Sequence, residues 1–183
     1  IQSIVPGLDI RITGSVMMDN AFGEASEQDG QVLIPVMISI VVISLWILLR
    51  SFTATLLTTV IIAFSIAIAL GLAGWLKMAL SPTSVASPNI ILTLAVADCV
   101  HLLSGFYRRA RGGIDKKQAI MESFKANFYA VLLTSLTTAI GFLSMNFSDA
   151  PPFRDLGNIT AIGVFSAYIL ATTFLISMMT FLP

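Results

Sequence analysis

The chain has 183 residues, of which 56% are hydrophobic and 11% are charged, with a formal net charge of zero and a mean hydropathy of +0.91. Soluble domains usually carry about 25% charged residues, so these few charges cannot cover a water-soluble globule of this size. One cysteine and one histidine exclude an internal disulfide and any multi-Cys or multi-His metal cluster, and the neutral net charge indicates no nucleic-acid partner.

The first 30 residues are the only stretch with soluble character. Residues 4–7 (Ile-Val-Pro-Gly) are typical of a turn, and residues 8–13 alternate apolar and polar side chains as a half-buried strand does. Residues 19–30 carry four carboxylates and no lysine or arginine. We predict that they form an acidic, partly helical lead-in to the membrane.

Five long apolar segments follow, each close to or above the roughly 20 residues that a helix needs to span a bilayer. Pro35 lies in the first turns of the first segment, where proline is tolerated. The serine–proline pair at residues 87–88 is a helix-start signal, and Asp115 and Gln118 have capping-box spacing, which predicts a helix from Lys116. We predict an all-α membrane protein with five transmembrane helices. The segments are residues 32–49, 54–76, 88–107, 127–147 and 156–182.

The distribution of lysine and arginine predicts the orientation of the segments. Six of the ten basic residues lie between residues 108 and 125, and Arg50 lies at the same end of the predicted bundle. Because such residues gather on the cytoplasmic side, we predict that the 50–53 turn and the 108–125 loop are cytoplasmic. The acidic N-terminal segment and the 148–155 loop then face outward. Orientation and contact with lipid headgroups are sufficient to explain the basic run.

Asp98 and His101 are the candidate functional residues at mid-membrane depth. Asp98 lies ten residues past Pro88, which is roughly 15 Å along a helix and half of a ~30 Å hydrocarbon core. Inserting an aspartate there costs about 2.5–3.5 kcal/mol, so we expect it to face the bundle and exchange a proton. His101 is one turn further on the same face and could modulate the protonation of Asp98. The alternative is a permanently protonated Asp98 that hydrogen-bonds a neighbouring helix.

Small and hydroxyl side chains form a stripe at helical spacing on the fourth segment. The stripe consists of Thr134, Thr137, Thr138, Gly141 and Ser144. Such residues allow close helix approach and donate hydrogen bonds in lipid. We predict that Gly141 and Ser144 serve helix packing, and that Thr134 or Thr138 contacts Asp98 and sets its protonation.

Enzyme motifs are absent from the sequence. Ser104 follows His101 by three residues, but no Gly-x-Ser-x-Gly motif accompanies it. An intramembrane aspartyl protease needs two carboxylates, and only Asp98 lies at depth. Without a Walker A motif there is no ATP site. We therefore expect no enzyme activity, no cofactor and no metal, and interpret Cys99 as a small packing residue.

Four stretches carry a resemblance to a known family. Residues 95–103 (Ala-Val-Ala-Asp-Cys-Val-His-Leu-Leu) with the Phe-Tyr-Arg-Arg of residues 106–109 resemble the fourth transmembrane helix of the RND superfamily. Its MMPL-like "predicted exporter" branch, with a sterol-sensing-like bundle, is the nearest match. Residues 130–142 resemble the fifth helix of that family, residues 151–157 the outer loop that follows it, and residues 33–52 the second helix and its tight turn.

The resemblance implies an architecture and a cellular location. Residues 1–30 would be a short α/β periplasmic remnant that ends an outward-facing porter domain. Residues 31–183 would be the transmembrane bundle, helices two to six of a six-helix RND half, in the bacterial inner membrane. The chain begins at Ile1 and ends at Pro183 directly after an apolar run, so we expect a piece of a longer polypeptide.

The resemblance also implies a function. The family uses the proton-motive force to export lipid-like or hydrophobic substrates, by proton antiport centred on an aspartate that corresponds to Asp98. We expect His101, Thr134 and Thr138 to complete the proton relay. Many members have Asp-Tyr where this chain has Asp98 followed by Cys99, so the phenolic partner directly after the aspartate is missing.

The expected partners are membrane lipids, the hydrophobic substrate and the remainder of the polypeptide or a second six-helix half, with a homo-oligomer also open. Two other functions remain open as well. One is a sterol- or lipid-sensing regulatory module that pumps nothing, and the other is a protein-translocation accessory subunit of the same superfamily. A pump requires an Asp98 that titrates, whereas a sensor could tolerate asparagine there.

Overall fold

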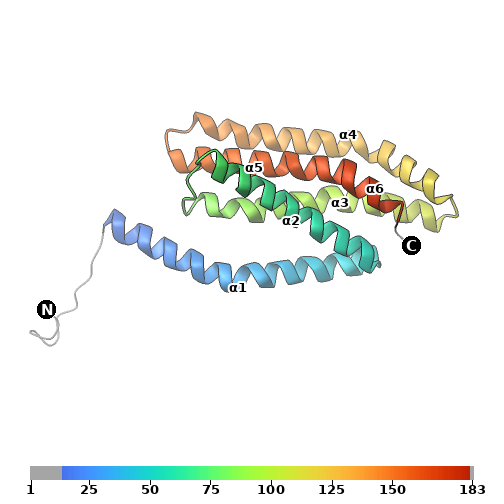
Figure 1. Ribbon diagram of the computed structural model, residues 1–183, viewed down its shortest axis with the longest axis horizontal. Coiled ribbons are helices and arrows are strands. Elements are labelled where there is room, and N and C mark those ends of the chain that lie inside the picture. Colours follow the sequence, from blue (N-terminus) through green and yellow to red (C-terminus); the bar gives the residue numbers. More distant parts are fainter. Residues whose placement is uncertain (1–13, 182–183) are drawn as a thin grey trace, which may run out of the picture. The chain divides into compact units, whose positions relative to one another are not determined.

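The computed structural model describes residues 14–181, and within that range every regular element is a helix (Figure 1). The α-helices are α1 (Ser15–Leu49), α2 (Phe52–Trp75), α3 (Ser87–Arg111), α4 (Lys116–Leu143), α5 (Pro151–Leu170) and α6 (Ile176–Met179). Short 3-10 turns, Ser84–Ala86 and Ser144–Phe147, precede α3 and follow α4, and a π-helical turn, Ala171–Leu175, joins α5 to α6.

Among residues 14–181, four helical stretches are long and apolar enough to cross a membrane, which indicates a multi-pass membrane protein. They are Phe52–Trp75, Ser84–Arg111, Lys116–Phe147 and Pro151–Met179. The apolar part of α1, Pro35–Leu49, is shorter than the roughly 20 residues of a typical span. The predicted all-α class is therefore found for residues 14–181, while the fifth span stays a prediction.

Two helices extend further toward the N-terminus than the sequence predicted. The helix α1 begins at Ser15 and includes the whole acidic lead-in of residues 19–30. Two alanines, two glutamates and one glutamine in this stretch favour helix. The helix α5 begins at Pro151, five residues before the predicted start, because proline is well accommodated in the first helical turn. The predicted strand at residues 8–13 lies outside the described residues.

The helix boundaries predicted around residues 108–125 agree better with the structure. The helix α4 begins at Lys116, and the Asp115 side chain caps it by accepting a hydrogen bond from the Lys117 backbone N–H at 3.1 Å. Gln118 does not complete the predicted capping box, because its amide donates to Glu122 at 2.9 Å. The helix α3 continues to Arg111, four residues beyond the predicted end, with its basic last turn favourably placed at the negative end of the helix dipole.

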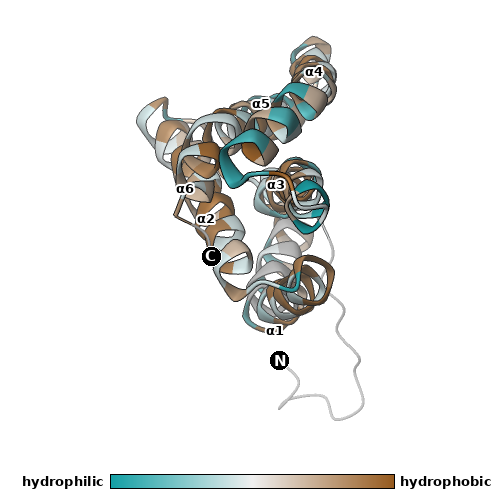
Figure 2. Ribbon diagram, turned by 90° about the vertical axis from the view of Figure 1, so that its right-hand side faces the viewer, coloured by the Kyte–Doolittle hydropathy of each residue, from teal (hydrophilic) through white to brown (hydrophobic). Residues whose placement is uncertain are grey.

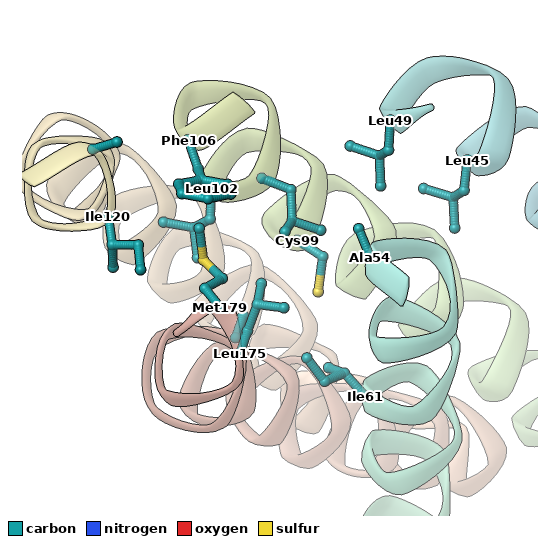
Figure 3. Close-up of a cluster of buried hydrophobic side chains, with 13 residues drawn as sticks. Leu45, Leu49, Ala54, Ile61, Cys99, Leu102, Phe106, Ile120, Leu175 and Met179 are labelled. Carbon is teal, nitrogen blue, oxygen red and sulfur yellow. The ribbon is translucent and has the colours of Figure 1, made fainter. Parts of the chain in front are cut away.

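The chain forms two compact units, Ile1–Met37 and Ile38–Pro183. In the second unit α5 packs against α2, α3 and α4. One apolar cluster takes its buried residues from the end of α1, from α2, α3 and α4, and from the π turn and α6 (Figure 3). Cys99, Leu102 and Leu175 are completely buried in this cluster, which agrees with the packing role expected for the cysteine.

Glycine sets the separation of α4 and α5. Gly157 is buried in the second turn of α5, and a Cβ atom there would overlap the backbone carbonyl oxygen of Phe142 on α4. The Cβ of Met145 would lie only 3.0 Å away. Since a backbone atom cannot swing aside as a side chain can, this contact requires a residue without a side chain.

The connection between α3 and α4 forms one end of the second unit, which we call the basic end because residues 108–125 lie there. Figure 2 looks onto this end and shows hydrophilic residues colouring the connection. The turn between α1 and α2, with Arg50, lies at the same end (Figure 1). The assignment of this end to the cytoplasm stays a prediction.

Candidate functional site

Asp98 lies in the middle of α3 with its side chain inside the bundle. It is eleven residues from the first residue of the helix, Ser87, or roughly 16 Å along the axis, and only 6% of its surface is exposed. The Ser135 hydroxyl of α4 donates a hydrogen bond to the Asp98 Oδ2 atom at 3.1 Å. The carboxyl group is therefore buried at mid-helix and tied to a second helix.

Ser135 belongs to the row of α4 residues that faces the bundle. Counting in steps of four, the buried residues Ala119, Ser123, Val131, Ser135 and Ala139 lie on one row of the helix. Small residues on such a row let two helices approach closely in lipid. Ser135 was not predicted from the sequence, because the adjacent stripe holds more hydroxyl groups. The row of small residues at intervals of four is the signal that could have identified it.

A second hydrogen bond fixes α3 against α4 on the side of the basic end. The buried Ser123 hydroxyl donates to the Leu102 carbonyl oxygen at 2.7 Å. Gly105 makes room for this contact, since a Cβ there would lie 2.5 Å from the Ser123 Oγ atom. Further toward the basic end, Arg109 Nε and Glu122 Oε2 are 3.5 Å apart. These contacts set the register in which Ser135 meets Asp98.

The helices α2 and α5 also pack against α3, the helix that carries Asp98. Tyr168 of α5 is half-buried, and its ring centroid lies 6.4 Å from that of Phe128 on α4. Thr58 of α2 contacts the thiol of Cys99, the neighbour of Asp98 in the chain.

His101 lies on α3 one turn from Asp98, and its side chain is exposed. Within the described residues the structure records no hydrogen bond between the two side chains. His101 instead lines an open cavity of about 270 Å³ that extends along α3 and α4 toward the basic end. The other lining residues are Ser104, Gly105, Arg108 and Asn127. The cavity therefore begins one turn beyond Asp98 on α3, and Asp98 is not among its lining residues.

The stripe predicted on α4 lies beside this site, and three of its residues, Thr134, Gly141 and Ser144, are exposed. The Thr134 hydroxyl donates to the Ala130 and Val131 carbonyls of its own helix, each at 3.0 Å. A Cβ at Gly141 would meet nothing within 4 Å. The Ser144 hydroxyl donates to the Gly141 carbonyl at 2.6 Å. Thr138 is half-buried, and the roles predicted for this stripe stay predictions.

The chemistry available at the site is proton exchange at one carboxyl group held by a hydroxyl. Among the described residues there is no group of three or more His, Cys, Asp or Glu side chains that could hold a metal ion. The hydroxyl of Ser135 can donate to a carboxylate and can also accept from a carboxylic acid. The contact between α3 and α4 can therefore persist while Asp98 gains or loses a proton.

Replacing Ser135 with alanine is expected to weaken the α3–α4 contact and to slow any process that depends on Asp98. The lost interhelical hydrogen bond corresponds to about 1 kcal/mol in lipid, so we expect a modest loss of thermal stability and a severalfold lower rate. Thr137→Ala is the matched control, because the exposed Thr137 hydroxyl bonds only its own helix. If Thr134→Ala or Thr138→Ala had the larger effect, the relay would run through the predicted stripe.

The sequence model of the MMPL family matches residues 1–182. The siderophore exporter MmpL5 of Mycobacterium tuberculosis is 28% identical over 164 residues, which are 87% of this chain and 17% of that protein. The membrane protein MJ1562 of Methanocaldococcus jannaschii is 23% identical over 93% of this chain and 44% of its own length. The membrane protein YdgH of Bacillus subtilis is 24% identical over 90% of this chain and 19% of its own length. The chain therefore spans less than half the length of each of these relatives.

Proposed function

This chain belongs to the MMPL family, and on that premise we propose that it forms part of a proton-driven exporter of lipid-like or other hydrophobic molecules. Members of the family are transporters rather than enzymes. The observation that carries the proposal is the buried Asp98 carboxyl group, which Ser135 holds between α3 and α4.

The position of Asp98 fits an energy-coupling role. A carboxyl group at this depth costs about 2.5–3.5 kcal/mol to insert. An apolar or hydroxyl side chain could fill a purely structural role with a smaller insertion free energy. One proton that crosses 100 mV releases about 2.3 kcal/mol. Changing the charge of Asp98 alters its hydrogen bond with Ser135, and so biases the packing of α3 against α4.

The cavity beside His101 supports a proton route from the basic end. Its lining extends from His101 to Arg108, which is roughly 10 Å along the axis of α3. Polar groups in such a lining can hold water. In this proposal water in the cavity delivers or removes the proton, and His101 adjusts the local charge.

The proposal includes a location and an orientation. The basic end would face the cytoplasm of a bacterial cell and the N-terminal segment would be periplasmic, in line with the positive-inside rule. A relative described as a siderophore exporter supports outward movement of a substrate. The remaining polypeptide of a longer protein would supply the pathway that the substrate follows.

Transport by the full-length protein in proteoliposomes tests the proposal. We expect a fluorescent phospholipid or a hydrophobic dye to move in response to an imposed pH gradient, and to stop when a protonophore collapses it. Empty liposomes and heat-inactivated protein serve as controls. Binding of the probe at the same level with no response to the gradient would indicate the alternative, a lipid-sensing module that pumps nothing.

A further inference from the structure

An apolar groove of about 560 Å³ lies at the basic end between the first turns of α4 and the end of the chain. Its α4 wall consists of Lys117, Ile120, Met121 and Phe124. This spacing of three, four and seven residues puts the four side chains on one helix face. The volume is within the roughly 300–1,000 Å³ of typical ligand pockets.

The opposite wall is built by the π-helical turn and α6. The π turn contributes the consecutive residues Thr172 and Thr173, and α6 contributes Ile176 and Ser177. The Thr173 hydroxyl donates to the Ile169 carbonyl at 2.6 Å, and the Ser177 hydroxyl to the Thr173 carbonyl at 2.9 Å. Because these hydroxyl protons are used within the helix, the wall offers mainly methyl and methylene groups to a ligand.

Lys117 is the one cationic residue among those that line this groove. Lys117 is exposed, and the structure records no ion pair for its ammonium group among the described residues. From Lys117 to Phe124 the groove descends seven residues, or roughly 10 Å. Half of a hydrocarbon core is about 15 Å, so a groove of this length fits within one leaflet with its charge at the headgroup level.

We infer that this groove binds an anionic phospholipid from the leaflet at the basic end. The lipid phosphate lies beside the Lys117 ammonium group, and the upper part of an acyl chain lies against Ile120, Phe124 and Ile176. Basic pockets between helices favour anionic headgroups in this way. The half-exposed Met121 lets the chain enter sideways from the bilayer. The groove is separate from Asp98, so binding does not require the proton site.

Photo-crosslinking to the full-length protein in nanodiscs tests this inference. The nanodiscs contain phosphatidylcholine with a small fraction of phosphatidylglycerol that carries a photoreactive acyl chain. We expect labelled peptides from residues 117–124 and 172–180. Lys117→Gln should lower the labelling about fivefold, the effect of one basic residue near an anionic surface, and Lys117→Arg should preserve it.

Two further variants separate charge from shape. Lys125→Gln removes a positive charge from an exposed residue of the same helix that does not line the groove, and should leave the labelling unchanged. Ser177→Trp fills the groove and should reduce the labelling although Lys117 is intact. Each variant is checked for folding by gel filtration and thermal unfolding. Asp98→Asn should label like the wild type, which separates this inference from the proposed transport.

Three results would overturn the inference. One is equal labelling by photoreactive phosphatidylcholine, which would show that the phosphate charge is not recognised. Another is an equal loss of labelling in Lys125→Gln, which would reduce the effect to general surface charge. The third is labelling confined to other peptides. Excess inorganic phosphate should not compete, and competition by it would indicate a simple anion site instead of a lipid site.

Discussion

Replacing Asp98 with asparagine is expected to reduce gradient-driven transport by the full-length protein to background, while the protein still folds. Asparagine has nearly the same shape and can still accept the hydrogen bond of Ser135 through its amide oxygen, so the α3–α4 contact survives. It cannot bind and release a proton. Each proton that crosses 100 mV supplies about 2.3 kcal/mol, and its loss lowers the substrate gradient that can be sustained by about 50-fold.

The measurement compares proteoliposomes of wild type and variant under the same pH gradient, with thermal unfolding as the test of folding. Asp115→Asn is the matched control, because it makes the same chemical change at the basic end, where asparagine caps a helix as well as aspartate does. Undiminished transport by Asp98→Asn would show that Asp98 is not part of a proton relay. Asp98 would then be a permanently protonated residue that holds α3 against α4.

Replacing Gly157 with alanine is expected to cause the largest loss of stability among single-methyl additions in the bundle. The new methyl group would overlap the Phe142 carbonyl oxygen, a backbone atom of α4. Relief requires the whole of α4 and α5 to move apart, and overpacking of this kind costs about 1–3 kcal/mol or more. We expect a clearly lower unfolding temperature in detergent. The unfolding of the helices is measured by circular dichroism.

Gly71→Ala provides the control for this prediction. Gly71 is an exposed residue of α2, and a Cβ there would meet nothing within 4 Å. Alanine favours helix over glycine by about 0.5–1 kcal/mol, so Gly71→Ala should leave stability unchanged or raise it. A stable Gly157→Ala variant would show that α4 and α5 are not in close contact there.

The same experiment examines the predicted packing role of Gly141. The structure leaves open space where its Cβ would be. If Gly141→Ala in the full-length protein lowers the unfolding temperature as Gly157→Ala does, the stripe on α4 packs against a part of the polypeptide outside this chain. If it behaves like Gly71→Ala, the close approach expected at Gly141 is absent.

The sequence by itself determined which segments are helical and that the chain is a membrane protein. Long apolar runs can satisfy their backbone groups in lipid only by forming helices, and this is a local property of each segment. The cap at Asp115 and the basic residues of the α3–α4 connection are local as well, so the start of α4 was predicted correctly. The burial of Asp98 also follows from the sequence, because its charge is too costly to face lipid at that depth.

Only the tertiary structure decided which face of each helix meets its neighbours. In a soluble protein the apolar face marks the interior, but in a membrane the lipid-facing side is also apolar, so helical periodicity does not tell the two apart. On α4 the hydroxyl-rich stripe with Thr134 was therefore chosen from the sequence, whereas the adjacent Ser135 donates to Asp98. The close contact at Gly157 likewise depends on the positions of two helices relative to each other, which no single segment contains.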